Sequence, residues 1–202
     1  VCIPSGNHDL PRISLGRDRE ELKVVYAFLF ALPCVPLIYY GDEIGMPYEN
    51  IPSKDGGYVR TGSRTPMQWT DSENAGFTTG TPWFYINENY KSINVEQALN
   101  DPDSILNFYK KAIALRKSLP VVRDGSYQEY YKGSDKLYVY ARETKEQKLL
   151  VICSFTDKPV RFQAPYNFSL SDMKLLLTNY DDTCEENSFL TRPYEARVYL
   201  YE

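Results

Sequence analysis

The stretch VCIPSGNHDLPRISLGRDREELKVVYAFLFALPCVPLIYYGDEIG, residues 1–45, decides the fold class. Its first three residues form a short apolar run that is typical of a buried strand. Asp18 to Pro33 is predicted to be a helix, because Asp18 can cap it, acidic residues fill its first turn and prolines follow it. Leu37 to Tyr40 form a second apolar run and predict another buried strand. Strand, helix and strand in this order indicate a parallel sheet with a right-handed crossover.

The loop after the first strand, SGNHDLPRIS, residues 5–14, holds the only histidine of the chain, His8. In parallel sheets the loops at the carboxyl ends of the strands carry the chemistry. His8 and its neighbour Asp9 are therefore candidate functional residues. The alternative is an ordinary loop histidine that caps a backbone group or is satisfied in the core.

Composition limits the partners that this chain can have. It has 202 residues, 43% of them hydrophobic and 25% charged, with a formal net charge of −4 and a pI of about 5.2. No basic run or basic-aromatic stripe is present, so we expect no nucleic-acid partner and favour a small or neutral substrate. No apolar stretch approaches the roughly 18 to 20 residues that cross a bilayer, so we expect no membrane partner.

The four cysteines lack CxxC spacing and have no histidine beside them; they are Cys2, Cys34, Cys153 and Cys184. This pattern predicts neither a metal site nor a cofactor. Three of the four lie in or beside apolar runs, where a reduced thiol packs as a small hydrophobe. Reduced cysteines favour a cytoplasmic location, although a leader cannot be assessed from a chain that starts at Val1.

The sequence pattern changes from helical spacing to strand alternation near residue 120. A loop rich in Gly, Pro, Ser and Asn covers about residues 44–80, and DPDSILNFYKKAIALRKSLP, residues 101–120, has helical spacing with Asp101 or Asp103 as its cap. Beyond it, six short runs alternate as strands with close turns: GSYQEYY, KLYVYARE, KLLVICSF, VRFQA, KLLLTN and EARVYLYE. We therefore predict two domains, residues 1–120 and an antiparallel β domain of residues 121–202.

A parallel sheet that opens on an internal strand and has only one more strand cannot bury both of its faces. We therefore expect the chain to be the last part of a larger protein. Strands left without neighbours would also expose an open sheet edge, which predicts self-association.

Four motifs occur in a specific order: SGNHDLPR, PLIYYGDEIGM, RTPMQWTDSENAGFT and the closing TRPYEARVYLYE. Together they resemble the last part of an α-amylase-family glycoside hydrolase (glycoside hydrolase family 13), in the oligo-1,6-glucosidase and α-glucosidase branch. The resemblance covers essentially the whole chain. It implies an α/β plus all-β fold, namely the last part of a (β/α)8 TIM barrel followed by an antiparallel β-sandwich domain.

The resemblance also implies roles for single residues. Asp9 would be the third active-site carboxylate, which stabilises the oxocarbenium-like transition state, and His8 and Arg64 would bind the glucose that is cleaved. The residues themselves, rather than the resemblance, predict that Asn7, Arg12, Asp42, Glu43 and Arg60 support this loop. The alternatives are that Asp42 and Glu43 act as a general acid and base pair, that Arg12 contacts substrate, and that Arg60 lies at the substrate rim or in a solvated loop. For Trp69 and Trp83 we expect packing beneath the long loop rather than stacking on sugar rings.

In the family, the nucleophile and the acid/base come from earlier barrel strands, so this chain alone should be inactive while the whole protein hydrolyses α-1,6 or α-1,4 glucosidic bonds. The segment of residues 47–64 is short compared with oligo-1,6-glucosidases, which leaves the linkage open. Alternatives are a transglycosylating or isomerising relative, of the sucrose isomerase or trehalose synthase type, and a non-catalytic scaffold of the transporter heavy chain type. A carbohydrate-binding module in residues 121–202 is a further alternative.

Overall fold

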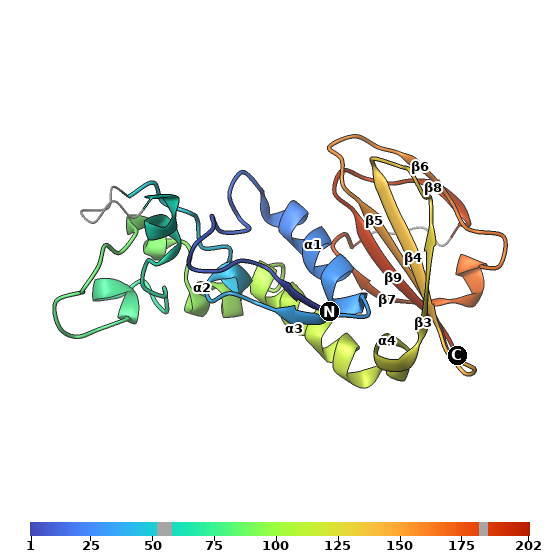
Figure 1. Ribbon diagram of the computed structural model, residues 1–202, viewed down its shortest axis with the longest axis horizontal. Helices are drawn as coiled ribbons and strands as arrows, with labels where there is room; N and C mark the ends of the chain where they lie inside the picture. Colours follow the sequence, from blue (N-terminus) through green and yellow to red (C-terminus); the bar gives the residue numbers. More distant parts are fainter. Residues whose placement is uncertain (52–57, 182–185) are drawn as a thin grey trace. The chain divides into compact units, whose positions relative to one another are not determined.

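The computed structural model describes residues 1–51, 58–181 and 186–202 (Figure 1). Its contacts divide the chain into two compact units. Unit 1 comprises residues 1, 23–34 and 110–202, and unit 2 comprises residues 2–22 and 35–109. Helices α1 (Arg19–Ala31) and α3 (Ile105–Ser118) each contribute to both units. Each unit has its own hydrophobic core.

Unit 2 begins with the predicted parallel strand pair. Strands β1 (Cys2–Pro4) and β2 (Val35–Leu37) pair in parallel, with Ile3 opposite Pro36. The second strand lies earlier than Leu37–Tyr40, so the two tyrosines follow it. Val35 and Leu37 are about half exposed. Val35 and Leu37 share one face of the strand, and among the described residues that face is not covered, so the prediction of a buried second strand was wrong for this chain.

Helix α1 starts where its sequence predicts. The Asp18 Oδ1 atom accepts a hydrogen bond from the Glu21 backbone N at 2.9 Å, and Glu21 Oε2 accepts one from the Asp18 N at 2.8 Å. These reciprocal bonds form a capping box that satisfies two backbone donors at the helix start. This cap fixes the chain just after the loop of residues 5–14 that carries His8 and Asp9, because Asp18 follows the loop by only a few residues.

A long connection follows β2 and contains short helical segments that the sequence analysis treated as loop. They are η1 (Asp42–Ile44), η2 (Tyr58–Ser63), η3 (Glu73–Gly76), η4 (Glu88–Lys91) and α2 (Val95–Asn100). Asn94 caps α2, because its Oδ1 atom accepts from the Gln97 backbone N at 2.8 Å. Ile44, Met46, Met67 and Leu106 form the buried core that holds this connection together.

Helix α3 confirms the predicted amphipathic helix but not its cap. Ser104 Oγ accepts from the Asn107 backbone N at 3.1 Å, so Ser104 is the capping residue instead of Asp101 or Asp103. Asp101 instead accepts from the Asp103 backbone N at 2.9 Å, which shapes the turn before the helix. A further short helix, α4 (Pro120–Asp124), has its proline in the first turn, where no backbone donor is needed.

The antiparallel part of unit 1 holds two sheets. A five-stranded sheet has the order β3-β4-β5-β9-β7, and β6 pairs with β8. Their bounds are β3 (Ser126–Tyr130), β4 (Leu137–Glu143), β5 (Lys148–Ser154), β6 (Arg161–Gln163), β7 (Lys174–Thr178), β8 (Ser188–Leu190) and β9 (Ala196–Tyr201). The six predicted strands are present, and β8 is additional. Phe162 of β6 and Phe189 of β8 join the buried residues of the larger sheet in one core, with η5 (Leu170–Asp172) at its margin.

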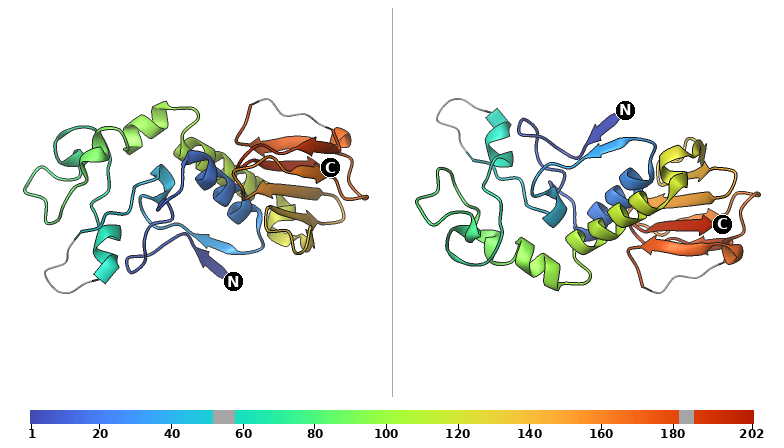
Figure 2. Two further views of the ribbon diagram at one scale, coloured as in Figure 1. Left: turned by 90° about the horizontal axis from the view of Figure 1, so that it is seen from above. Right: turned by 90° about the horizontal axis from the view of Figure 1, so that it is seen from below.

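Buried and partly buried polar side chains tie helix ends to the sheet within unit 1. The backbone of α1, α3 and the sheet strands that carry these side chains can be followed in Figure 2. Arg116 of α3 donates to the carbonyl oxygens of Phe30 and Leu32 at 2.7 and 3.0 Å. Tyr140 of β4 donates to the Phe28 carbonyl oxygen at 2.7 Å, and Arg142 of β4 donates to that of Ala31 at 3.1 Å. These donors satisfy the carbonyl groups that a helix leaves unpaired in its last turn.

Candidate active site

The loop after β1 is shaped by Asn7. Its Oδ1 atom accepts hydrogen bonds from the backbone N of Asp9 at 2.7 Å and of Leu10 at 3.1 Å. A side-chain amide that accepts from the backbone two and three residues on imitates a backbone turn. Asn7 therefore turns the chain so that the next two side chains, His8 and Asp9, project from the loop. Both of these side chains are more than half exposed.

The structure brings together the three residues that the resemblance assigns to substrate. Arg64 Nη2 lies 3.1 Å from Asp9 Oδ1, and Arg64 Nε donates to the His8 carbonyl oxygen at 2.9 Å. His8 Nε2 lies 3.4 Å from Asp9 Oδ2. A carboxylate, an imidazole and a guanidinium thus converge on one exposed point, although Arg64 is more than 50 residues away along the chain.

Arg12 lies beneath this loop and is almost completely buried. Its Nη2 donates to the Ser63 carbonyl oxygen at 3.1 Å, one residue before Arg64, and its Nη1 lies 3.5 Å from Asp42 Oδ1. Gly41 has φ of 85°, and a Cβ atom there would meet Arg12 Nη1 at 3.0 Å. The guanidinium therefore connects the loop after β1, the loop after β2 and the segment that presents Arg64.

Asp42 is buried, and both of its carboxylate oxygens contact residues that hold these loops together. Ser5 Oγ donates to Asp42 Oδ2 at 2.7 Å, and Ser5 Oγ also accepts from the Tyr39 backbone N at 3.0 Å. Burial raises the pKa of Asp42, while the hydrogen bond from Ser5 and the charge of Arg12 act in the opposite direction. Its position fits support of the loops rather than contact with substrate.

Glu43 differs from Asp42, because it faces a hollow. The hollow has a volume of about 350 Å³ and is lined by Glu43 and Arg64 together with Tyr40, Pro66, Met67, Trp69, Phe77 and Trp83. Burial raises the pKa of Glu43, and its Oε2 atom has no hydrogen-bond partner among the described residues. A buried acceptor without a partner is costly, so a donor brought by a ligand would be favoured there.

The two tryptophans are exposed, so the prediction of buried packing was wrong. Trp83 is 70% exposed and Trp69 is 48% exposed, and both line the hollow beside Arg64. Trp69 is held by its backbone, whose N donates to the Ala75 carbonyl oxygen at 2.9 Å. The ring of Trp83 stacks on Phe84 at a centroid distance of 5.1 Å. The loop is thus fixed by backbone bonds and leaves these indoles at the surface.

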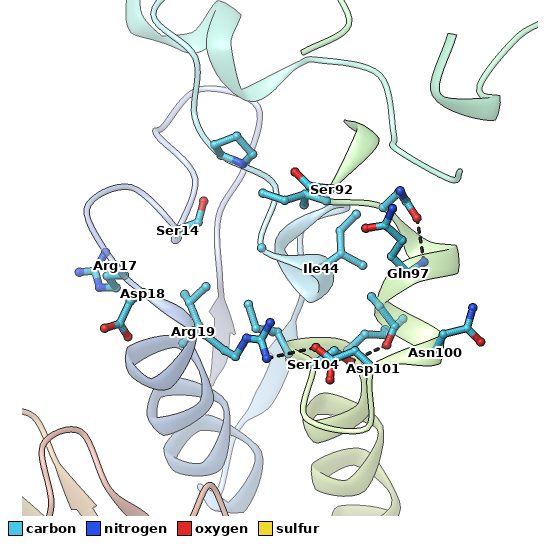
Figure 3. A pocket seen from close by; sticks show the side chains of 18 residues that line it. Ser14, Arg17, Asp18, Arg19, Ile44, Ser92, Gln97, Asn100, Asp101 and Ser104 are labelled. Atoms are coloured by element: carbon cyan, nitrogen blue, oxygen red, sulfur yellow. Dashed lines mark hydrogen bonds and ion pairs between the residues drawn. The ribbon is translucent and has the colours of Figure 1, made fainter. Parts of the chain in front are cut away.

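A separate hollow of about 750 Å³ lies in unit 2, where the side chains of Ser14, Arg17, Arg19 and Gln97 surround it (Figure 3). Its charged groups already have partners, since Arg19 Nη1 lies 3.1 Å from Asp101 Oδ2. None of His8, Asp9 and Arg64 lines it. We therefore place the candidate active site at the hollow beside Arg64.

Several predicted features lie outside this site. Arg60 belongs to η2, and its side chain lies outside the described part of the structure. Cys2, Cys34 and Cys153 form no disulfide with one another, and Cys184 lies outside the described residues. In the described ranges, no three His, Cys, Asp or Glu side chains gather to hold a metal ion. None of the described helices has the length and apolar character needed to cross a membrane.

Sequence and structure comparisons place this chain in one family. Residues 2–125 match the family described as "Alpha amylase, catalytic domain". The chain belongs to the α-amylase family. It spans about two fifths of the length of the curated relatives that it matches.

The similar proteins include several enzymes that act on glucosides. The oligo-1,6-glucosidase of Halalkalibacterium halodurans is 39% identical over 232 residues, covering 96% of this chain and 41% of the relative. The trehalose-6-phosphate hydrolase of Escherichia coli is 36% identical over 96% of this chain and 41% of the relative. The first alignment is longer than this 202-residue chain, so the chain lacks residues that the relative has.

Solved structures agree with this assignment. The trehalose-6-phosphate hydrolase of Bacillus licheniformis superimposes with a TM-score of 0.87 at 35% identity, covering 100% of this chain and 43% of that chain. An isomaltulose synthase from Klebsiella sp. LX3 gives a TM-score of 0.88 at 30% identity, covering 98% of this chain and 42% of that chain. Both units therefore have counterparts in known enzymes of this kind.

Proposed function

We propose that the whole protein is a retaining α-glucoside hydrolase that acts on oligosaccharides, and that this chain supplies one of its three active-site carboxylates. The observation that carries the proposal is the convergence of His8, Asp9 and Arg64 beside an aromatic hollow. Membership of the α-amylase family and similarity to oligo-1,6-glucosidases support it.

Asp9 would act by charge. Cleavage of a glycosidic bond passes through an oxocarbenium-like state, and a fixed carboxylate stabilises the positive charge that develops on the sugar ring. Arg64 holds the Asp9 side chain at 3.1 Å and keeps other guanidinium donors for ring hydroxyls. His8 would donate to hydroxyl groups of the same sugar, whose hydrogen bonds strengthen in the transition state.

Replacing Arg64 with lysine should separate orientation from charge. A lysine keeps one positive charge but cannot bind the Asp9 carboxylate and the His8 carbonyl oxygen together as the planar guanidinium does. We expect Arg64→Lys in the whole protein to lower kcat/KM about 100-fold. Steady-state kinetics on the cleaved disaccharide measure it. Arg17→Lys, at an exposed arginine away from the site, should leave kcat/KM unchanged, and equal loss in both variants would contradict this role.

The hollow beside Arg64 would bind the sugar ring on the other side of the cleaved bond from the glucose that His8 and Arg64 contact. Trp69, Phe77 and Trp83 offer flat faces for the C–H surfaces of a sugar ring, and the free Glu43 Oε2 offers an acceptor for a hydroxyl. We propose this role for the hollow as part of the same function.

Removing the most exposed indole tests the hollow. Trp83→Ala should raise KM about tenfold and leave kcat nearly unchanged, because stacking on the neighbouring sugar ring, which does not carry the developing charge, binds substrate and transition state alike. Initial rates over a range of substrate concentrations separate the two constants. Tyr85→Ala is the control, since Tyr85 is half exposed but does not line the hollow. A fall in kcat with unchanged KM would contradict the proposed stacking.

Hydrolysis by the whole protein tests the function. Maltose, isomaltose and sucrose should be offered side by side, and we expect glucose release from at least one of them. Cleavage of isomaltose alone would indicate α-1,6 specificity, and cleavage of maltose alone would indicate α-1,4 specificity. No cleavage of any α-glucoside would favour the non-catalytic scaffold of the transporter heavy chain type.

The 202-residue chain by itself should release no glucose from maltose or isomaltose. A retaining mechanism needs a nucleophile and an acid/base roughly 5 to 5.5 Å apart, and we propose that both come from earlier strands of the barrel. A sensitive glucose assay on the purified chain checks this expectation. Glucose release that persists in an Asp9→Asn version would reveal a contaminating enzyme. Release that depends on Asp9 would overturn the proposal that the nucleophile and the acid/base lie on earlier strands of the barrel.

A specific observation favours a second candidate function. Isomaltulose synthases are among the similar solved structures, as in Klebsiella sp. LX3. An isomerising or transglycosylating enzyme would keep the same carboxylate and differ in how it admits water. Formation of a new disaccharide from sucrose, in place of free glucose and fructose, would identify it.

Several further features are proposed with this function. Residues 1–120 would be the last part of a (β/α)8 barrel and residues 121–202 a separate antiparallel β-sandwich domain. The outer edges of the two-stranded β1–β2 sheet, which no further strand covers among the described residues, would let the isolated chain self-associate. The reduced cysteines favour a cytoplasmic protein.

A further inference from the structure

A third hollow lies in unit 1, at one end of the antiparallel five-stranded sheet. It has a volume of about 510 Å³, within the range of roughly 300 to 1,000 Å³ that is usual for small-ligand sites. Lys148, the first residue of β5, lies opposite Tyr201, the last residue of β9, and both line the hollow. Two residues further in, Leu150 lies opposite Tyr199 on the same face, and both are buried in the core.

This alternation explains how the hollow is built. Side chains two apart on a strand share a face, so Lys148 and Tyr201 continue the core-facing side of the sheet beyond the end of the core. Phe168 and Met173 belong to the core and also line the hollow, so the hollow ends on apolar side chains. The segment that leads into η5 forms another wall.

The walls carry aromatic and neutral polar groups. Tyr166 is fully exposed and Tyr201 is 48% exposed, so the faces of both rings are open to a ligand. Asn187 Oδ1 accepts from the Leu170 backbone N at 2.6 Å, which fixes the amide and leaves its nitrogen to donate elsewhere. Asn167 and Ser169 add an amide and a hydroxyl, which are held by Tyr130 Oη at 3.1 Å and by Ser171 Oγ at 3.0 Å.

Charge argues against other kinds of ligand. Lys148 and Asp172 line the hollow and carry opposite charges, so an anion such as a phosphate group gains no net attraction. The polar walls do not suit an apolar peptide side chain. Flat aromatic faces with amide and hydroxyl groups around them match a sugar, which has apolar C–H faces and hydroxyl groups at its edges.

We propose that this hollow is a second saccharide-binding site, separate from the candidate active site, and that it binds one or two residues of a neutral oligosaccharide. The proposal goes beyond the function proposed above, because the ligand class follows from the lining residues of unit 1 alone. The site would hold a glucan chain without cleaving it, since Asp172 is the single carboxylate among the described residues that line it and glycoside hydrolysis uses a pair.

An NMR titration of the 202-residue chain with maltotetraose and with isomaltotriose measures binding and tests the proposal. The titration is made on Arg64→Ala, which should weaken binding at the hollow beside Arg64. We expect a saturable site with a millimolar dissociation constant that Tyr166→Ala, added to Arg64→Ala, weakens about tenfold. Tyr166 is fully exposed, so its replacement should leave the fold unchanged.

Two further variants sharpen the result. Tyr166→Phe keeps the ring and should bind as the parent does, and Leu190→Ala, at a half-exposed side chain outside the hollow, should have no effect. No saturable binding in Arg64→Ala, or binding that is unchanged by Tyr166→Ala, would overturn the proposal. Neither result bears on the hydrolytic function, because glucose release by the whole protein reports on Asp9 independently.

Discussion

Asp9→Asn in the whole protein is expected to lower kcat/KM by at least about a thousandfold. The amide has nearly the shape of the carboxylate and can still contact Arg64 Nη2, but it carries no negative charge for the developing oxocarbenium ion. Because Asp9 is exposed and its ion pair is at the surface, the free energy of unfolding should change little. Kinetics and urea unfolding of the same preparation give both values.

Asp71→Asn is the matched control, because Asp71 is an exposed aspartate that does not line the hollow beside Arg64. It should retain wild-type kcat/KM. If Asp9→Asn kept more than about a tenth of the wild-type activity, electrostatic stabilisation of the transition state by Asp9 would be refuted.

Arg142→Ala is expected to lower the free energy of unfolding by about 3 to 5 kcal/mol. Arg142 is almost completely buried in β4, and its guanidinium donates to the carbonyl oxygens of Ala31, Val122, Gly125 and Ser126 at 2.7 to 3.1 Å. Alanine would leave these carbonyl groups without their donor and would open a cavity. Urea unfolding of the 202-residue chain measures the change.

Arg123→Ala provides the comparison. Arg123 is exposed and pairs only with its neighbour Asp124 in the described structure, so we expect no measurable change in stability. The free energy of unfolding of Arg142→Lys should lie between those of Arg142→Ala and Arg123→Ala, because lysine can satisfy some but not all of the four carbonyl groups. Equal stability of Arg142→Ala and Arg123→Ala would show that the buried guanidinium does not hold the helix ends to the sheet.

Local sequence signals predicted the elements that have strong local causes. The capping box of Asp18 and Glu21 places the start of α1, and alternation predicted six strands of unit 1. The short elements α2, α4 and β8 were missed, because three to six residues carry too little periodicity to separate a helix or strand from a loop. The cap of α3 was assigned to an aspartate when Ser104 makes the bond, since all these residue types cap equally well.

The candidate site was partly predictable. His8, Asp9 and Arg64 were found through motif resemblance, while their contacts depend on tertiary structure that local sequence does not contain. The exposure of Trp69 and Trp83 was missed, because a loop held by backbone bonds can present large aromatic side chains that composition alone would bury. The four aromatic residues spread over residues 66–84 were the signal that could have indicated a sugar-binding surface.

The anomeric configuration of the first sugar released by the whole protein tests the central claim most directly. The substrate is whichever α-glucoside the protein cleaves, and proton NMR follows the product before mutarotation. A retaining hydrolase, with Asp9 as its third carboxylate, must release the α-anomer first. Release of the β-anomer would mean inversion and would contradict the proposed mechanism.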